Sequence, residues 1–167
     1  MAHATLVLGG ARSGKTARAL ALARAPRTYV ATAQALDGEM AERIARHKAE
    51  RGPDWGLVEA PLALAAAIRD AAEDGRTLVV DCLTLWLSNL MHEGRDPEAE
   101  AEGLAAALAE APGRIVLVSN EVGLGLVPME KLSRDFRDAQ GRLNQRIAAA
   151  ADVVEFVAAG LPLRMKG

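Results

Sequence analysis

The sequence predicts an α/β protein with a mostly parallel sheet that helices cover on both faces. Short apolar runs rich in β-branched residues alternate along the chain with alanine-rich segments of helical period. Such alternation is typical of βαβ units, whose strands are buried on both faces and are therefore apolar throughout. A glycine-rich segment between the first strand candidate and the first helix candidate also indicates this class, because α/β folds bind phosphate at such turns.

The expected elements follow from these runs and from the glycines, prolines and polar residues that flank them. We expect strands at 5–8, 28–31, 57–60, 77–81, 115–119 and 153–157. We expect helices at 15–25, 38–51, 62–73, 83–92, 98–110 and 131–151. The tail, GLPLRMKG, could add a last strand beside the sheet. A chain of 167 residues fits one domain, spanning 1–167.

Composition excludes several classes of function. The chain has 20 Lys and Arg against 22 Asp and Glu, and only 3% of its residues are aromatic, so no nucleic acid partner is expected. Its single cysteine, Cys82, excludes an internal disulfide framework and indicates a reducing compartment. The apolar runs are too short for a signal peptide or a membrane span. We therefore expect a soluble, cytoplasmic protein.

The segment GGARSGKT, residues 9–16, matches the phosphate-binding P-loop pattern in the required strand-to-helix context. Gly9 and Gly14 allow the backbone to turn so that successive N–H groups point at phosphate oxygens. Lys15 is expected to reach the β and γ phosphates, and the Thr16 hydroxyl is expected to bind Mg²⁺. The alternative is a glycine-rich turn with no ligand.

Asp81 ends the apolar run TLVVD and is the second expected metal ligand. A P-loop requires an acidic residue at the carboxyl end of a buried strand, where it can hold the metal directly or through water. Asp is also a favoured N-cap, so Asp81 could instead cap the helix expected from 83. The two interpretations can coexist.

Two other strand ends carry polar residues at the edge where α/β proteins bind ligands. ATAQ follows the second expected strand, and VSNEVGLG follows the fifth. Ser119, Asn120 and Glu121 are therefore candidate site residues, although Asn120 could simply cap the loop.

His47 lies among cations on the helix expected at 38–51. Arg43, His47 and Arg51 stand at four-residue spacing and form one stripe, with Met40 and Ile44 on the adjoining flank. The surrounding positive charge favours the neutral imidazole. The alternative is a half-buried histidine that packs against Ile44 and does no chemistry.

Five segments together resemble the bifunctional adenosylcobinamide kinase and adenosylcobinamide-phosphate guanylyltransferase family of cobalamin biosynthesis. They are GGARSGKT, YVATAQALDGEMAERIARHKAER, VVDCLTLWLSNL, VSNEVGLGLVP and FRDAQGRLNQRIAAAADVVEFVAAGLPLRMKG. The combination of RIARHKAER, VSNEVGLGLVP and RDAQGRLNQRIA is the most specific part. The resemblance runs from about residue 5 to the C-terminus, and it implies a RecA-like P-loop NTPase fold and a homotrimer. The implied reactions are phosphorylation of adenosylcobinamide by ATP or GTP, and then transfer of GMP from GTP to adenosylcobinamide phosphate with release of pyrophosphate.

The resemblance also assigns residues. It implies that His47 is guanylylated and therefore catalytic, beside Lys15 as the catalytic lysine and Thr16 and Asp81 as the Mg²⁺ ligands that the P-loop and the strand end already predict. The implied nucleotide contacts are Gly9, Gly10, Ala11, Arg12, Ser13, Gly14, Lys15, Thr16, Ala31, Thr32, Ala33, Lys48, Ala49, Glu50, Arg51, Glu59 and Asp81.

Three hypotheses about function remain at this stage. The first is the two-step enzyme. The second is a plain small-molecule kinase in which His47 is structural, and the third is a P-loop switch or ATPase module that regulates a partner.

Glu59 could select guanine as the nucleotide base, because a carboxylate can accept hydrogen bonds from the N1–H and N2 amino groups of guanine. Its alternative is a solvated side chain at a strand end.

Overall fold

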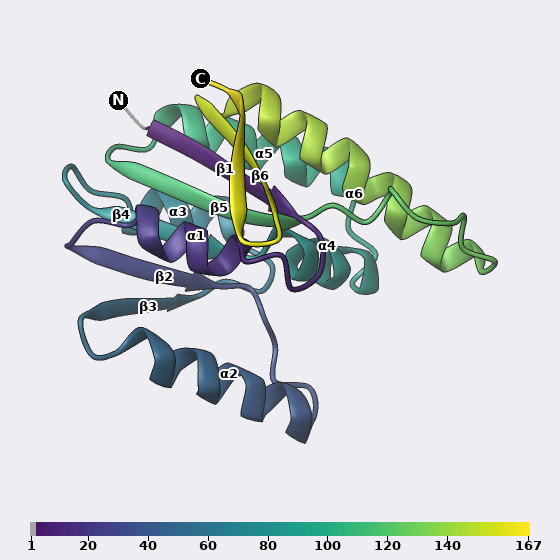
Figure 1. The fold of residues 1–167 in the computed structure, drawn as a ribbon, viewed down its shortest axis with the longest axis horizontal. Coiled ribbons are helices and arrows are strands. Elements are labelled where there is room, and N and C mark those ends of the chain that lie inside the picture. Colours follow the sequence, from purple (N-terminus) through teal and green to yellow (C-terminus); the bar gives the residue numbers. More distant parts are fainter. Residues whose placement is uncertain (1–2) are drawn as a thin grey trace.

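A computed structural model describes residues 3–167 of the chain. Its centre is one seven-stranded sheet with the strand order β3-β2-β4-β5-β1-β6-β7 (Figure 1). Every neighbouring pair is parallel except β6 and β7, which are antiparallel. The strands are β1 (His3–Gly9), β2 (Arg27–Ala31), β3 (Trp55–Glu59), β4 (Thr77–Asp81), β5 (Arg114–Asn120), β6 (Val153–Ala158) and β7 (Leu161–Lys166).

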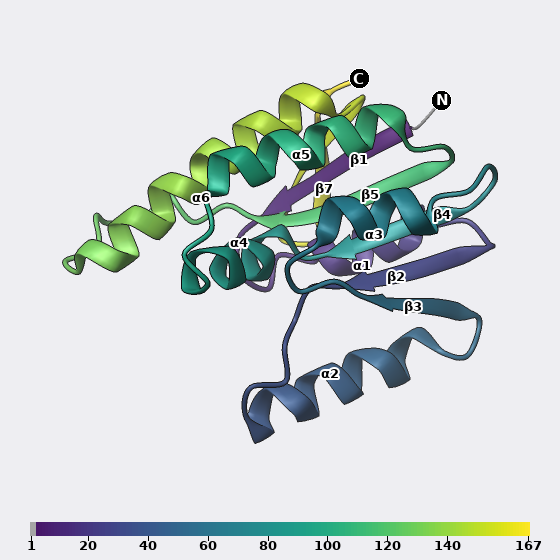
Figure 2. The ribbon, with the colours of Figure 1, turned by 180° about the vertical axis from the view of Figure 1, so that it is seen from behind.

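Helices cover both faces of the sheet unequally. They are α1 (Lys15–Leu22), α2 (Gly38–Arg51), α3 (Leu64–Ala71), α4 (Leu83–His92), α5 (Pro97–Glu110) and α6 (Lys131–Ala150). Helix α1 lies on one face, whereas α3, α4, α5 and α6 lie on the other (Figures 1 and 2). Helix α2 lies apart from them, beyond the β3 edge, and has no buried residue.

Two buried clusters follow from the alternation of side chains along the central strands. On β1, Leu6 and Leu8 join the cluster under α3 to α6, while Val7 joins the smaller cluster under Ala19 of α1. Residues 4–9 of β1 are buried, as expected for a strand covered on both sides. The predicted class, a mostly parallel α/β sheet with helices on both faces, is therefore confirmed.

Several element ends differ from the sequence prediction. Helix α1 ends at Leu22 rather than at 25, because Ala25 precedes Pro26 and the residue before a proline disfavours helical backbone. Helix α3 is shorter at both ends than the expected 62–73, and Ala72 is already extended. The tail does form a strand, β7, after a tight turn in which Ala159 and Gly160 both adopt positive φ.

The register of the sheet aligns the carboxyl ends of five strands. Gly9 of β1 lies opposite Asn120 of β5, and Ala31 of β2 lies opposite both Asp81 of β4 and Glu59 of β3. Ligands of open α/β sheets bind outside this edge. The fold thus gathers the glycine-rich turn, the acidic strand end and the start of α2 along one side of the molecule.

Among the described helices, none combines the length and the apolar character that a membrane crossing requires.

Candidate active site

The turn between β1 and α1 has the backbone geometry of a phosphate cradle. Gly14, the N-cap of α1, has a φ of 95°, and Arg12 also adopts positive φ. A Cβ atom on Gly9 would press against Ser13 Oγ and lie 2.7 Å from the Val157 carbonyl oxygen. Gly9 and Gly14 therefore meet two different demands: close approach of backbone at the first and left-handed backbone at the second.

Segments distant in sequence hold this turn in place. The Glu121 N–H donates to the Gly9 carbonyl oxygen at 2.9 Å, and the Gly160 N–H donates to the Ser13 carbonyl oxygen at 2.8 Å. The end of β5 and the β6–β7 turn thus brace the cradle from two sides. The Ser13 hydroxyl is buried and makes no hydrogen bond within residues 3–167. An unpaired buried hydroxyl in this turn is a polar group that a bound phosphate could satisfy.

Lys15 lies at the start of α1, half-buried, and its Nζ donates to the Gly10 carbonyl oxygen at 2.8 Å. Burial lowers the pKa of Lys15, Cys82 and Asp81 oppose this effect, and Arg43 of α2 adds to it. An ammonium group removed from water beside a row of N–H groups is suited to a polyanion.

Asp81 lies between Thr16 and Tyr29. The Thr16 hydroxyl is 3.5 Å from Asp81 Oδ2, and the Tyr29 hydroxyl donates to the same oxygen at 2.6 Å. The interpretation of Asp81 as a helix cap is wrong, because the N-cap of α4 is Cys82, whose Sγ accepts from the Leu85 N–H. Burial and then the neighbouring Asp81 raise the pKa of Tyr29, so the phenol stays protonated and donates.

The oxygen pair of Thr16 and Asp81 fits Mg²⁺. This ion prefers hard oxygen ligands and is held by one or two protein groups together with substrate phosphates and water. No cluster of three or more His, Cys, Asp or Glu side chains that could hold a metal occurs in the described part of the chain. The donor set therefore suits a metal that arrives with a nucleotide rather than an all-protein metal cage.

Thr32 has a structural position. It is fully buried, and its hydroxyl donates to the Cys82 carbonyl oxygen at 2.7 Å and accepts from the Cys82 N–H at 2.9 Å. Its own carbonyl oxygen accepts from Asn89 Nδ2. These bonds fasten the end of β2 to the start of α4, so they leave its half-buried neighbours Ala31 and Ala33 better placed than Thr32 to meet a nucleotide.

Helix α2 presents one half-buried flank. Asp37 caps its N-terminus by accepting from the Met40 N–H at 2.7 Å. The half-buried residues are Met40, Ile44, His47 and Arg51, and the Arg51 guanidinium lies 3.6 Å from the centroid of the Tyr29 ring. His47 thus lies one turn from Arg51, which contacts Tyr29, and one turn from Arg43.

The remaining predicted contacts on α2 and β3 are exposed. Lys48, Ala49 and Glu50 face solvent on α2, and Glu59 is exposed at the carboxyl end of β3, opposite Ala31. In the cradle, Ala11 and Arg12 are exposed while Gly10 and Thr16 are half-buried. The cradle residues and Glu59 lie at the carboxyl ends of the strands, and Lys48, Ala49 and Glu50 lie on α2.

Ser119 belongs to a buried polar network rather than to an open site. It is fully buried, donates to Asn144 Oδ1 at 2.7 Å and accepts from Gln140 Nε2 at 2.9 Å. Asn120 differs from it. The Asn120 N–H donates to Thr84 Oγ1, but its side-chain oxygen is buried with no hydrogen bond to any described residue. The predicted loop cap by Asn120 is thus absent from residues 3–167.

The sequence prediction missed Tyr29, because a tyrosine within the apolar run TYVA is not distinguishable from a core aromatic residue. It is the only tyrosine of the chain, and a hydroxyl that must find a partner when buried was the one available signal.

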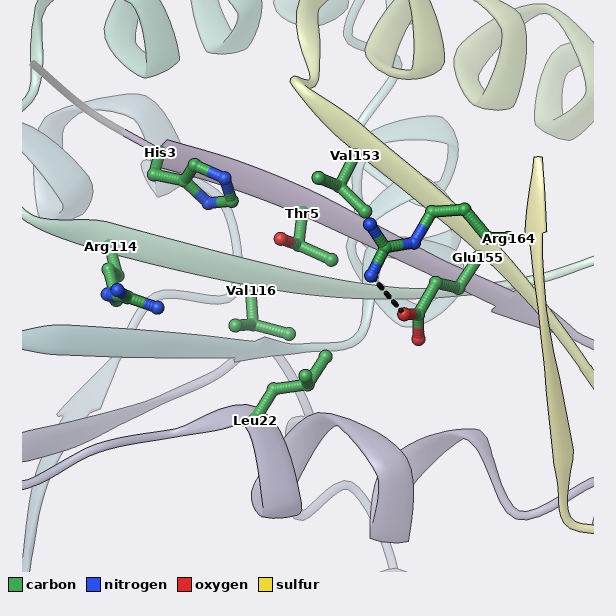
Figure 3. Close-up of a pocket in the computed structure, with 8 residues that line it drawn as sticks. All are labelled: His3, Thr5, Leu22, Arg114, Val116, Val153, Glu155 and Arg164. Atoms are coloured by element: carbon green, nitrogen blue, oxygen red, sulfur yellow. Dashed lines mark hydrogen bonds and ion pairs between the residues drawn. The ribbon is translucent and has the colours of Figure 1, made fainter. Parts of the chain in front are cut away.

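Two cavities of the fold lie away from the cradle. The first, about 260 Å³, opens at the amino ends of β1, β5 and β6 and is shown in Figure 3. Glu155 on its wall is ion-paired with Arg18 and Arg164, which lowers the pKa of Glu155, mainly through Arg18. The second, about 310 Å³, lies between α5 and α6. Neither is lined by a predicted site residue.

The fold and the cradle define a P-loop NTPase with a RecA-like sheet. Solved structures with a similar fold include the flagellar accessory protein FlaH of Methanocaldococcus jannaschii (TM-score 0.55, 14% identity, 98% of this chain and 78% of that chain). They also include a prototypical ATPase from the type III secretion system of pathogenic bacteria (TM-score 0.55, 13% identity, 97% and 56%). At these identities the similarity shows the fold alone.

The family is shown by sequence. Residues 5–165 match the family described as cobinamide kinase / cobinamide phosphate guanyltransferase. The chain is 53% identical to the bifunctional adenosylcobalamin biosynthesis protein CobP of Pseudomonas aeruginosa, covering 97% of this chain and 96% of that protein. It is 39% identical to the bifunctional adenosylcobalamin biosynthesis protein CobU of Escherichia coli, covering 96% and 98%. The protein therefore belongs to the cobinamide kinase / cobinamide phosphate guanyltransferase family of enzymes, as its motifs predict.

Proposed function

We propose that this enzyme phosphorylates adenosylcobinamide with ATP or GTP and then transfers GMP from GTP to adenosylcobinamide phosphate through a guanylyl-histidine at His47. One observation carries the proposal. The flank of α2 that bears His47 is tied to the cradle, because Arg51 stacks on Tyr29 and Tyr29 binds Asp81. His47 lies one turn from Arg51 on this flank, so this series of contacts links the helix that carries His47 to Asp81, the residue proposed to hold Mg²⁺.

In the kinase step, the cradle would bind and orient the triphosphate. The N–H groups of residues 9–16 and the N-terminus of α1 surround the phosphates, and Lys15 neutralises the charge that develops on the transferred phosphoryl group. Thr16 and Asp81 would hold Mg²⁺. When bound, this ion would neutralise part of the charge on the phosphates.

In the guanylyl step, a neutral imidazole nitrogen of His47 attacks the α-phosphorus of GTP. A P–N bond forms as the bond from the α-phosphorus to the bridging oxygen breaks, and pyrophosphate leaves. A phosphate oxygen of adenosylcobinamide phosphate then attacks the same phosphorus, and the P–N bond breaks to restore the imidazole. Arg43, Arg51 and Lys48 supply positive charge as pyrophosphate departs.

Glu59 would select guanine in this second step. It is exposed at the end of β3, on the strand that follows α2, so its carboxylate is free to accept hydrogen bonds from the N1–H and N2 amino groups. Adenine lacks this pair of donors, so it would leave the carboxylate unsatisfied.

We also propose that the protein acts in the cytoplasm as a homotrimer. A buried thiol at Cys82 suits a reducing compartment. Exposed apolar side chains gather on the segment that joins β5 to α6 and on the first turn of α6, and such a patch is typical of a surface that another protein chain covers. These residues are Val122, Leu124, Leu126, Val127, Met129 and Leu132.

The intact mass of the protein after incubation with GTP and Mg²⁺ tests the proposal. We expect one added GMP, stable to base and labile to acid as a phosphoramidate should be. His47→Ala should abolish the adduct and guanylyl transfer while retaining much of the kinase activity. His92→Ala, which removes an exposed histidine from α4, is the matched control and should still form the adduct.

The alternatives predict different results. A plain kinase would form no adduct with GTP and Mg²⁺, although it would phosphorylate adenosylcobinamide when this substrate is added. Without adenosylcobinamide, a regulatory ATPase would hydrolyse nucleotide repeatedly, whereas the proposed enzyme should stop after one GMP per chain. Persistence of the adduct in His47→Ala would place the nucleophile elsewhere.

A further inference from the structure

Tyr29 contacts two parts of the proposed site, because its hydroxyl binds Asp81 and its ring lies against Arg51 of α2. It lies on β2 and is 5% exposed. Because Ala31 lies opposite Asp81 in the parallel β2–β4 pair, Tyr29 and Asp81 point to the same face of the sheet, two residues apart along it. This diagonal spacing allows the long tyrosine side chain to reach the carboxylate, and its hydroxyl donates to Asp81 Oδ2 at 2.6 Å.

The ring of Tyr29 contacts the end of α2 and the start of β3. The Arg51 guanidinium, at the last residue of α2, lies 3.6 Å from the ring centroid. Trp55, at the first residue of β3, meets the ring edge-on, with the centroids 6.3 Å apart. Cation–π and edge-to-face contacts of this kind orient a ring and stabilise the groups that touch it. The tyrosine thus contacts both ends of the connection between α2 and β3.

We propose that Tyr29 is a positioning residue that couples the two halves of the site. Its hydroxyl holds the Asp81 carboxylate beside Thr16 for the metal-bound nucleotide, and its ring holds the C-terminal turn of α2, the helix that carries His47. The consequence for His47 rests on the proposed function, whereas the effects on Asp81 and on the stability of α2 do not.

The hydroxyl and the ring can be tested separately. Tyr29→Phe removes the hydroxyl and keeps the ring. Hydrogen bonds that orient a metal-binding carboxylate are typically worth 10-fold or more in metal affinity, so the apparent Mg²⁺ affinity should fall about tenfold. The measurement is calorimetric binding of a non-hydrolysable GTP analogue over a series of Mg²⁺ concentrations. At saturating Mg²⁺, the His47 adduct should form at close to the normal rate.

The matched control for this variant is Thr77→Val. Thr77 is fully buried at the opposite end of β4 from Asp81, and its hydroxyl accepts from the Arg24 N–H at 3.2 Å. The control therefore also removes one buried hydroxyl, and it should leave the Mg²⁺ dependence unchanged. Equal Mg²⁺ dependence in Tyr29→Phe, Thr77→Val and the unmodified protein would overturn the first half of the inference.

Tyr29→Leu removes the ring as well. We expect faster hydrogen exchange of the amides in the last turn of α2 than in Tyr29→Phe, because only the leucine variant loses the stacked Arg51. The adduct should also form more slowly at saturating Mg²⁺. Equal exchange of these amides in the two variants would overturn the second half. If the unmodified protein forms no adduct at all, the proposed function fails, while the Mg²⁺ and exchange measurements still decide the role of Tyr29.

Discussion

Gly9 and Gly10 are adjacent in the P-loop motif, yet the structure predicts opposite outcomes when each is replaced by alanine. A Cβ atom at Gly9 would lie 2.7 Å from the Val157 carbonyl oxygen and against Ser13 Oγ, whereas a Cβ atom at Gly10 would meet no atom within 4 Å. The serine side chain can rotate, but the Val157 carbonyl belongs to β6, which pairs with β1 throughout this region. In Gly9→Ala the cradle or the strand must therefore move.

Forcing an extra carbon into packed surroundings costs about 1–3 kcal/mol. Both substitutions also reduce the conformational entropy of the unfolded chain, which stabilises each variant by about 0.4–1 kcal/mol. This gain cancels in the comparison, so Gly9→Ala should be less stable than Gly10→Ala by about 1–3 kcal/mol. For a chain of this size, the difference corresponds to a melting temperature about 2–12 °C lower.

The assay is thermal and urea unfolding of the two variants without nucleotide, followed by calorimetric binding of a GTP analogue. Gly9→Ala should also bind nucleotide more weakly, because its N–H groups no longer point at the same place. Equal stability of the two variants would refute the reasoning, since it would mean that the backbone around Gly9 yields at no cost.

Three further predictions concern charge and assembly. Lys15→Ala should keep its melting temperature and lose both activities by roughly 100-fold or more, because both reactions start from a triphosphate in one cradle; near-normal activity in either assay would show separate sites. Ion pairing with Arg18 lowers the pKa of Glu155 in the folded protein. The stabilisation that this ion pair gives is therefore fully present at pH values above the pKa of Glu155 in the unfolded chain, and it is lost as the pH falls through the pKa of Glu155 in the folded protein. Urea unfolding between about pH 6 and pH 3 should therefore show a flatter loss of stability in Glu155→Gln than in Glu110→Gln, an exposed control, and parallel curves would contradict this. Sedimentation equilibrium should give three chains, and Leu126→Asp should shift the protein towards monomers; a fully active monomer at micromolar concentration would argue against the trimer.

The regular elements and the cradle were predictable because their signals are local. A strand buried on both faces needs a run of apolar residues, and a P-loop needs glycine at defined positions, whatever the rest of the chain does. The α/β class, the strand formed by the tail and the family all follow from such signals. Element ends were less predictable, since α1 stops at Leu22 under the influence of a proline four residues further on.

The contacts within the site were not predictable in the same way. Asp81 was identified, but its partner Tyr29 lies 52 residues away in the sequence and became its neighbour only through the pairing of β2 with β4. Whether Asp81 caps α4 was likewise open until Cys82 proved to be the N-cap of that helix. Ser119 and Asn120 look alike in the sequence, yet one is enclosed in hydrogen bonds with α6 and the other keeps a buried oxygen unpaired within the described chain.

The sequence by itself thus determined the class of fold, the phosphate cradle, the cationic helix around His47 and the family to which the chain belongs. Only the tertiary structure decided that Arg51, Tyr29 and Asp81 form one connected series of contacts from that helix to the cradle. The physical reason is the range of the interactions. Propensity, periodicity and turn geometry act over a few residues, whereas an ion over a ring or a hydroxyl on a carboxylate depends on which strands pair and in which register.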